Sequence, residues 1–447
     1  MSVAAYISRR VVFPNAVRPA AIVVDTDSGT ILRIAEHDAP GRVDNTHDHG
    51  DHVILPGLID PHVHLNEPGR TEWEGFRTGT RAAAAGGITT VIDMPLNCLP
   101  PTTTVAGLEA KRAAAATQST VDWRAWGGAE NGNQRHLAGL AAAGVPGYKC
   151  FLVDPGCEGL GILDRVNLRA AMPIIATTGL PLLVHAEDPF VIAQVQSAAN
   201  TDPRRYADYL RSRPDAAETV AIAHLIELCR EFGTRVHIVH LATAEALPML
   251  RAARVEGLPI TVETCPHYLH FAAEDIADGA TLLKCAPPIR SRANRDLLRA
   301  AVADGTIDLV ASDHSPCPPA MKNAATGRFD TAWGGIASLS LGLPIVWTAL
   351  GPSLNDVARL MSSAPAALAG LGARKGRIAA GFDSDLVVFA PEQSFVVAPR
   401  HLHFRHAISP YPCERLQGVV RETIVRGVTV YRDGVFPGEP VGREVRI

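Results

Sequence analysis

The chain lacks the features that mark nucleic-acid-binding, membrane-spanning and secreted proteins. Its 42 basic and 46 acidic residues leave a net charge of −4. No basic run stands out, so nothing favours binding to nucleic acid or to an anionic membrane. No apolar stretch approaches the roughly 18 to 20 residues that a membrane-spanning helix needs. At the start of the chain the charges follow the apolar residues, the wrong order for a secretory signal.

The cysteines also lack a pattern: there are eight, scattered along the chain, with no Cys-x-x-Cys pair. In a chain of 447 residues, such scattered cysteines are typical of reduced, mostly buried thiols. Hydrophobic residues make up 47% and charged residues 20%, which is ordinary for a globular protein. We therefore expect a cytoplasmic globular protein with a sizeable core. The length allows a large barrel together with a smaller unit.

The two ends of the chain share one sequence pattern, in which short apolar segments are separated by Pro, Asp and Gly. This holds for residues 1–53 and again for residues 376–447. Neither piece is large enough to fold comfortably alone. We expect the two to pair into one small β-sandwich domain.

Between them, residues 54–375 alternate apolar strands with Ala-rich helices. The expected strands are 54–60, 88–93, 121–126, 147–152, 181–185, 235–240, 259–264 and 307–312, and the expected helices include 76–85, 218–232 and 244–255. Eight strands alternating with helices predict an α/β fold, a (β/α)8 TIM-like barrel. In such a barrel the chemistry lies at the C-terminal ends of the strands.

The first expected barrel strand is followed by His62 and His64. Because side chains alternate along an extended chain, both point to the same side and form a pair of ligands for zinc or a similar metal. A bare His-x-His is more often an ordinary pair of histidines near a turn. Matching residues at the ends of later strands shift the balance towards a metal site.

Four such residues are Lys149, His185, His240 and Asp313. Lys149 lies within an apolar strand. It is either a lysine that extends to solvent at a strand edge, or a buried neutral amine that takes up CO2 and becomes an anionic, bridging ligand. His185 and His240 close two strands, and alternation selects His240 over His237, which we expect to point into the helix layer.

Together, the six residues cap five strands in strand order, which favours a two-metal site over unrelated core polar groups. Two metals about 3.5 to 4 Å apart would hold a bridging hydroxide. Asp313 would accept its proton as general base and return it as general acid. Zinc is the first candidate for the metal, with cobalt, manganese and iron(II) as alternatives for the same ligands.

Residues 47–52 (His-Asp-His-Gly-Asp-His) also look like a metal-binding tract. They precede the first barrel strand and lie in a turn-rich segment. We interpret them as a solvated loop, with adventitious metal capture as the alternative.

Four motifs stand out: 56–64 (Pro-Gly-Leu-Ile-Asp-Pro-His-Val-His), 147–149 (Gly-Tyr-Lys), 263–268 (Glu-Thr-Cys-Pro-His-Tyr) and 312–316 (Ser-Asp-His-Ser-Pro). They resemble the signatures of the cyclic amidohydrolases, the family that includes allantoinase, dihydroorotase and hydantoinase (dihydropyrimidinase). The resemblance covers nearly the whole chain. It implies that His62, His64 and Asp313 hold one metal, that His185 and His240 hold the other, and that N6-carboxylated Lys149 bridges them. It also implies a homotetramer.

Local differences distinguish the branches of this family. Asn66 stands where dihydroorotases typically have an arginine that binds the substrate carboxylate, and Asp154 stands where hydantoinases have a tyrosine that serves as an oxyanion donor. The remaining motifs, at 66–76, 93–97, 149–152, 333–338 and 409–411, are similar to the allantoinase branch. That branch implies hydrolysis of the hydantoin-ring amide of allantoin to allantoate, in purine catabolism.

For substrate contacts we select Asn97 and Ser315, which follow the second and eighth strands; a turn-capping Asn and a helix-capping Ser are the alternatives. The nearest alternative function is a hydantoinase or dihydropyrimidinase of broad cyclic-amide specificity. A more distant one is a non-catalytic, dihydropyrimidinase-like scaffold, which predicts lost ligands, whereas all six are present here.

Overall fold

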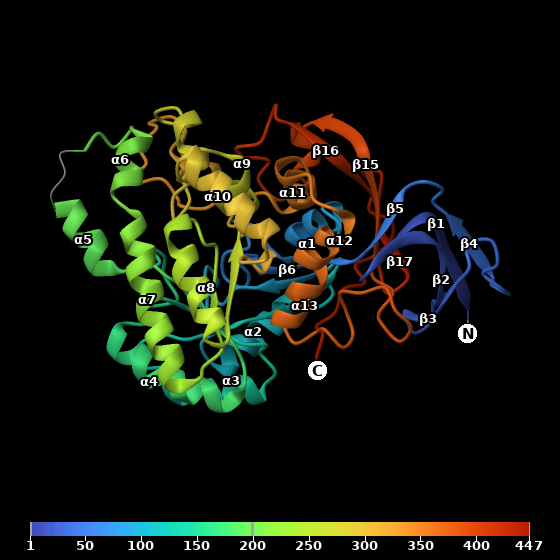
Figure 1. Ribbon diagram of the computed structural model, residues 1–447, viewed down its shortest axis with the longest axis horizontal. Helices are drawn as coiled ribbons and strands as arrows, with labels where there is room; N and C mark the ends of the chain where they lie inside the picture. The colour runs from blue at the N-terminus through green and yellow to red at the C-terminus, as the bar shows by residue number, and fades with distance from the viewer. Residues whose placement is uncertain (1, 198–200, 447) are drawn as a thin grey trace.

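A ring of parallel strands surrounded by helices forms the larger part of the molecule (Figure 1). The computed structural model describes residues 2–197 and 201–446, and within them eight strand positions make up the ring. They are β6 (Leu58–Val63), β7 (Ile88–Asp93), β8 (Asp122–Ala125) with β9 (Gly127–Gly128), β10 (Tyr148–Phe151), β11 (Leu182–His185), β12 (Val236–Ile238), β13 (Ile260–Thr264) and β14 (Leu309–Val310).

Backbone hydrogen bonds link these strands around the ring. Strands β6, β7 and β8 form one parallel sheet, and β9 to β14 form another. Trp126 N donates to Asp93 O (3.0 Å) and Gly127 N to Gly147 O (2.9 Å), which joins the two sheets at β8 and β9. On the other side His64 N donates to His314 O (2.9 Å), next to a parallel bridge between Val63 and His314. The predicted barrel is confirmed.

Helices follow the barrel strands and cover their outer side. They are α1 (Phe76–Ala85), α2 (Val105–Ala115), α3 (Gln134–Ala142), α4 (Arg165–Thr178), α5 (Pro189–Ser197), α6 (Tyr206–Arg211), α7 (Asp215–Phe232), η1 (Ala244–Ala246) with α8 (Leu247–Val255), α9 (Pro266–His270), α10 (Arg292–Ala303), α11 (Gly342–Leu350), α12 (Leu354–Ala358) and α13 (Ala364–Leu368). The three helices expected from the sequence are confirmed. Helix α7 ends where the sequence predicts, because Gly233 adopts a left-handed φ of 67° at its C-terminus.

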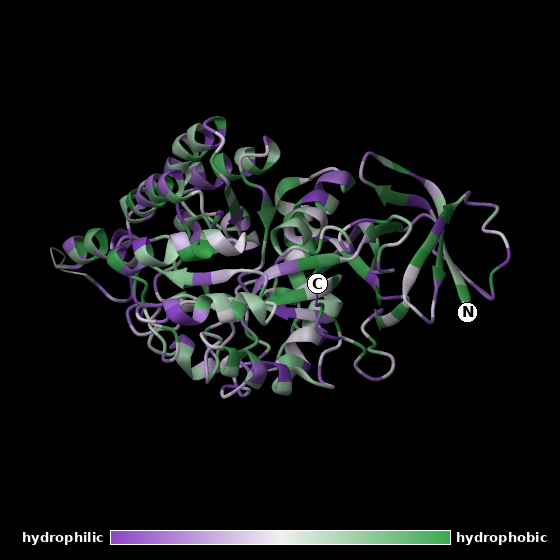
Figure 2. Cartoon of the chain, turned by 90° about the horizontal axis from the view of Figure 1, so that it is seen from below, coloured by the Kyte–Doolittle hydropathy of each residue, from purple (hydrophilic) through white to green (hydrophobic). Residues whose placement is uncertain are grey.

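The barrel contains two hydrophobic layers. One fills the interior and includes Ile59, Ile92 and Leu183, which lie in three different strands, and Val239, which directly follows β12. The other lies between the strands and the helices. Figure 2 accordingly shows mainly hydrophobic colour on the central strands and hydrophilic patches on the surrounding helices. Within the described residues, no helix combines the length and the apolar character that crossing a bilayer requires.

The two ends of the chain form the smaller part, at the right of Figure 1. Its strands are β1 (Val3–Phe13), β2 (Ala16–Asp25), β3 (Thr30–Ala35), β4 (Asn45–Asp48), β5 (Val53–Pro56), β15 (Leu386–Val396), β16 (Arg415–Val425) and β17 (Val428–Arg432). They follow the order β17-β16-β15-β5-β1-β2-β3, with β4 beside β1. Tyr6, Ile22, Leu386 and Ile424 share one buried core. The predicted pairing of the two ends is therefore confirmed.

The strand expected over residues 54–60 is in fact two strands, and that prediction was wrong. Strand β5 pairs with β1 and β15 in the small domain, whereas β6 opens the barrel. The chain changes sheet at Gly57. A Cβ there would lie 2.3 Å from Thr89 Oγ1 and 2.7 Å from Asp385 Cβ, so the close approach of the two parts requires glycine.

The histidine-rich tract is also more ordered than expected. His47 and Asp48 are not part of a loop but of strand β4 (Asn45–Asp48), which pairs in parallel with β1, whereas residues 49–52 form a turn, as predicted. The His47 ring stacks on Tyr6 with 4.9 Å between the ring centroids.

A buried ionic cluster joins the barrel to the small domain. Lys375 Nζ contacts Asp122 Oδ2 (2.8 Å), Asp383 Oδ2 (3.0 Å) and Asp385 Oδ2 (2.5 Å). Arg426 binds the other oxygen of Asp122. Asp122 belongs to barrel strand β8, and Asp383 and Asp385 immediately precede β15, so these contacts hold the two parts together.

Candidate metal centre

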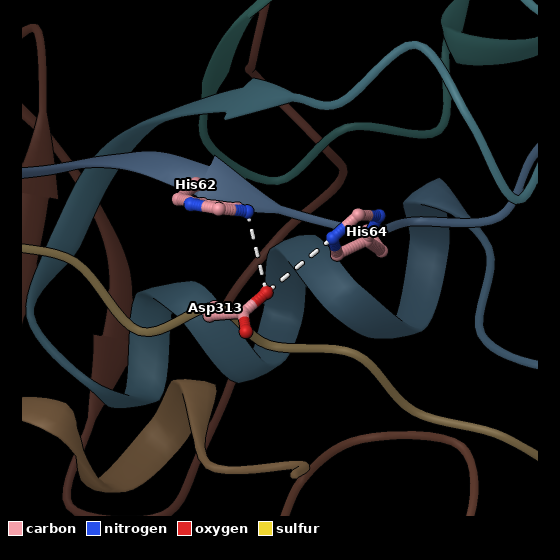
Figure 3. Close-up of side chains that lie close together, drawn as sticks. All are labelled: His62, His64 and Asp313. Carbon is pink, nitrogen blue, oxygen red and sulfur yellow. Dashed lines mark ion pairs between the residues drawn. The ribbon is translucent and has the colours of Figure 1, made fainter. Parts of the chain in front are cut away.

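Two histidines and an aspartate converge at the C-terminal ends of the barrel strands (Figure 3). His62 lies near the end of β6, His64 just beyond it, and Asp313 follows β14. His62 Nε2 and His64 Nε2 lie 3.3 and 3.4 Å from the same oxygen, Asp313 Oδ1. All three residues are buried, and their atoms form a group of suitable size for a metal ion.

The hydrogen bonds of His62 show that a cation fits this group. Its Nδ1 lies 2.5 Å from Glu263 Oε1, and a carboxylate can only accept, so His62 carries its proton on Nδ1. The lone pair on Nε2 then faces the anionic oxygen of Asp313. Two such electron-rich atoms 3.3 Å apart repel each other unless a cation lies between them.

A second group lies beside the first. His185 Nδ1 is 3.0 Å from His240 Nε2, and the His62 and His240 rings are 5.4 Å apart. His185 Nε2 lies 2.7 Å from Glu187 Oε2, which places the proton on Nε2 and the lone pair of Nδ1 towards His240. Two further imidazole nitrogens are thus available to a metal.

Lys149 lies within β10 and is fully buried. Among the described residues its Nζ has no hydrogen-bond partner, although it lies 4.7 Å above the Phe151 ring. Burial lowers the pKa of Lys149 to about 8. The amine is therefore neutral far more often than that of an ordinary lysine, as uptake of CO2 requires.

The prediction that His237 points into the helix layer was wrong. His237 pairs in register with Leu183, a member of the interior cluster, and its Nε2 lies 3.1 Å from Glu263 Oε2. Strand β12 ends at Ile238, and His240 has a φ of 38°. This left-handed turn brings His240 to the interior although alternation from His237 would place it outside.

Sequence reasoning missed the residues that orient the metal-binding candidates. Glu263 and Glu187 accept hydrogen bonds from His62 and His185, and both carboxylates are fully buried. A charged residue inside an apolar strand was the available signal for Glu263, and a Glu two positions after His185 was the signal for Glu187. His267 was missed as well: it is buried beside Asp313, and in the described part of the chain neither ring nitrogen has a partner.

A cavity of about 1200 Å³ opens above these residues. Its lining includes five candidate ligands and both residues selected for substrate contact: His62, His64, His185, His240, Asp313, Asn97 and Ser315. Asn97 Nδ2 lies 3.3 Å from His64 Nδ1, so Asn97 contacts a candidate ligand as well as the cavity. Asp154 also lines the cavity, together with Trp73 and Trp333, whose rings meet edge to face at 4.9 Å.

Comparison with known proteins places this site in a family. Residues 53–430 match the amidohydrolase family. The chain belongs to that family. Allantoinase of Streptomyces avermitilis is 49% identical over 98% of this chain and 97% of its own length, and allantoinase of Saccharomyces cerevisiae is 43% identical over 96% of both.

Among amidohydrolases of known structure, L-hydantoinase (dihydropyrimidinase) from Arthrobacter aurescens superimposes with a TM-score of 0.93 over 99% of both chains, at 28% identity. Membership of this family makes the chain a hydrolase of cyclic amides and implies a divalent metal site. The His and Asp residues described above fit that site in ligand type and spacing.

Proposed function

We propose that this amidohydrolase is an allantoinase, which hydrolyses the hydantoin-ring amide of allantoin to allantoate. The observation that carries the proposal is full-length similarity: two allantoinases from distant organisms share 49% and 43% identity with the chain. The hydantoinase structure has nearly the same fold at only 28% identity. Asn66 and Asp154, which depart from the dihydroorotase and hydantoinase patterns, support the same choice.

In this proposal His62, His64 and Asp313 would hold one metal, His185 and His240 would hold the other, and Lys149, as a carbamate, would be a ligand shared by the two. When bound, the two ions, zinc as first candidate, polarise the ring carbonyl and make water nucleophilic at neutral pH. The carbamate forms when the neutral Nζ of Lys149 adds to CO2 and releases one proton. The buried, unpartnered Nζ supports this assignment.

Asp313 moves the proton. Burial alone would raise the pKa of Asp313, but positive charge at His62 and His64, from a protonated ring or from the cation that the rings would hold, lowers it far below its usual range. The group is therefore a carboxylate at neutral pH. It accepts the proton of the attacking water and delivers it to the ring nitrogen as the C–N bond breaks.

The cavity supplies the remaining contacts. We propose that Asn97 and Ser315 bind the substrate, because both line the cavity that the candidate ligands also line. Asp154, at the position of the hydantoinase tyrosine, lines the cavity but offers no phenolic hydroxyl to an oxyanion, so a bound metal would have to supply that stabilisation.

A substrate panel tests the proposal. Purified protein loaded with zinc or cobalt is assayed with allantoin, hydantoin, dihydrouracil and dihydroorotate, and metal per chain is measured on the same sample. We expect about two metals per chain and the highest kcat/KM with allantoin. A higher kcat/KM with hydantoin or dihydrouracil would replace the proposal by the hydantoinase alternative, which the TM-score of 0.93 favours.

We further propose a cytoplasmic homotetramer. Of the segment predicted as the barrel, residues 54–375, the first residues belong to β5 of the small domain, and the barrel begins at β6. Sedimentation velocity tests the assembly. A monomer that retains full activity would contradict it.

A further inference from the structure

One buried carboxylate touches both candidate half-sites. Glu263 lies within β13 and is fully buried. Its Oε1 accepts the Nδ1 proton of His62 at 2.5 Å and also the backbone N–H of His240 at 3.3 Å. Its Oε2 accepts from His237 Nε2 at 3.1 Å. All of these partners are N–H groups.

The contact with His62 selects a tautomer. With the proton held on Nδ1, only Nε2 has a free lone pair, and Nε2 is the atom that faces Asp313. The ring cannot rotate away without breaking the bond to Glu263. Glu263 thus fixes both the protonation and the direction of one ligand of the first half-site.

The contact with His240 selects a backbone conformation. His240 has a φ of 38°, in the left-handed region that residues other than glycine seldom adopt. That conformation points its N–H at Glu263 and its ring at His185, with 4.7 Å between the ring centroids. Among the described residues His240 Nδ1 has no partner, so no side chain orients this ring through that atom.

We propose that Glu263 is a shared positioning residue that sets the geometry of both metal half-sites at once. This inference rests on the metal assignment made in the proposed function. It predicts that one substitution in β13 weakens two metal sites whose ligands come from other strands.

Glu187 provides the matched control. It is as deeply buried as Glu263 and also accepts a hydrogen bond from a candidate ligand, His185 Nε2, at 2.7 Å. Its other partner is Arg213, not a residue of the first half-site. The same chemical change at Glu187 is therefore expected to weaken only the His185 and His240 side.

The test is a cobalt(II) titration of metal-free wild-type protein, Glu263→Gln and Glu187→Gln, monitored by the absorption of the bound ion and by metal per chain. Loss of an outer hydrogen-bond partner typically lowers metal affinity by about 10- to 100-fold. We expect both cobalt affinities to fall in Glu263→Gln, and one to fall in Glu187→Gln. Glutamine keeps the volume and one acceptor oxygen, so circular dichroism should match that of the wild type.

A further variant, Glu263→Met, removes the acceptor altogether, and both affinities should fall more than in Glu263→Gln. Because glutamine keeps an oxygen that can accept from both His62 and His240, Glu263→Met decides the question. Two unchanged affinities in Glu263→Met, or a fall in only one, would overturn the proposal. A wild-type protein that binds no cobalt would instead contradict the proposed function, so the two failures are distinguishable.

Discussion

Two lysines in this molecule are equally buried and have opposite surroundings. Lys375, between the barrel and the small domain, contacts three aspartates at 2.5 to 3.0 Å. Lys149, at the candidate metal centre, has no hydrogen-bond partner in the described part of the chain. Burial alone would lower the pKa of Lys375, yet the three carboxylates raise it above the ordinary value. For Lys149 burial prevails and lowers the pKa to about 8.

The difference shows that partners, rather than burial, decide what a buried lysine does. Lys375 stays charged and holds two parts of the molecule together. Lys149 is readily neutral, and a neutral amine is a nucleophile that can be carboxylated. The four predictions below test this contrast.

The largest expected effect is on activity. Lys149→Ala should abolish turnover and lower the metal content while the barrel stays folded. Loss of metal Lewis acidity, worth several kcal/mol, corresponds to at least about 10³-fold in kcat. Turnover, metal per chain and circular dichroism measure the outcome. Added bicarbonate should not restore activity, whereas a short-chain carboxylic acid should restore part of it by replacing the carbamate. Near-normal turnover of Lys149→Ala would contradict the proposed role of Lys149 as a shared metal ligand.

The second effect is on stability. Lys375→Met leaves Asp122, Asp383 and Asp385 without their buried cation, and breaking such a pair costs about 3–5 kcal/mol. Denaturant unfolding should show this loss. The matched change Lys149→Met, compared in metal-free protein, removes an amine that has no partner to lose, so no comparable fall is expected. Equal losses in the two variants would contradict the contrast.

The third effect is on pH dependence. Only the neutral amine of Lys149 reacts with CO2, and its pKa of about 8 lies below the ordinary value. In metal-free, decarboxylated protein, the rate of reactivation by bicarbonate and metal should rise about tenfold per pH unit below pH 8 and level off above it. The rate must be compared at constant dissolved CO2. A rate that keeps rising to pH 10 would mean that the lysine has an ordinary pKa.

The smallest effect is expected at His237. This residue contacts Glu263 but not the candidate ligands, so His237→Ala should keep both metals. Any fall in the metal affinity of His237→Ala should be smaller than the fall in Glu263→Gln. Calorimetric metal titration of the two variants side by side makes the comparison. If the single substitution His237→Ala is enough to cause loss of a metal, Glu263 depends on His237 for its position.

The sequence predicted the barrel and the convergence of its polar residues, because apolar strands, helical spacing and strand-end position are all visible in it. It did not reveal where β5 ends and β6 begins. That boundary depends on Gly57 passing close to Thr89 and Asp385, and Asp385 is remote in sequence. Strand alternation failed at His240, because its φ of 38° is a backbone choice that residue types do not show. The role of Glu263 was hidden for a related reason, since its partners come from β6 and β12.

The antiparallel pairing of β5 with β15 also determines when the sheet of the small domain can be completed during translation. Pro56 pairs with Leu386, so nearly the whole barrel is translated between the two strands. A nascent chain therefore carries β1 to β5 with one edge of β5 unpaired until β15 leaves the ribosome, and an open edge is a template for pairing with other chains. Every residue assigned to the metal centre has been made by that point. A chain truncated just before residue 386 would thus have the full set of candidate ligands and an open sheet edge, and we expect it to aggregate.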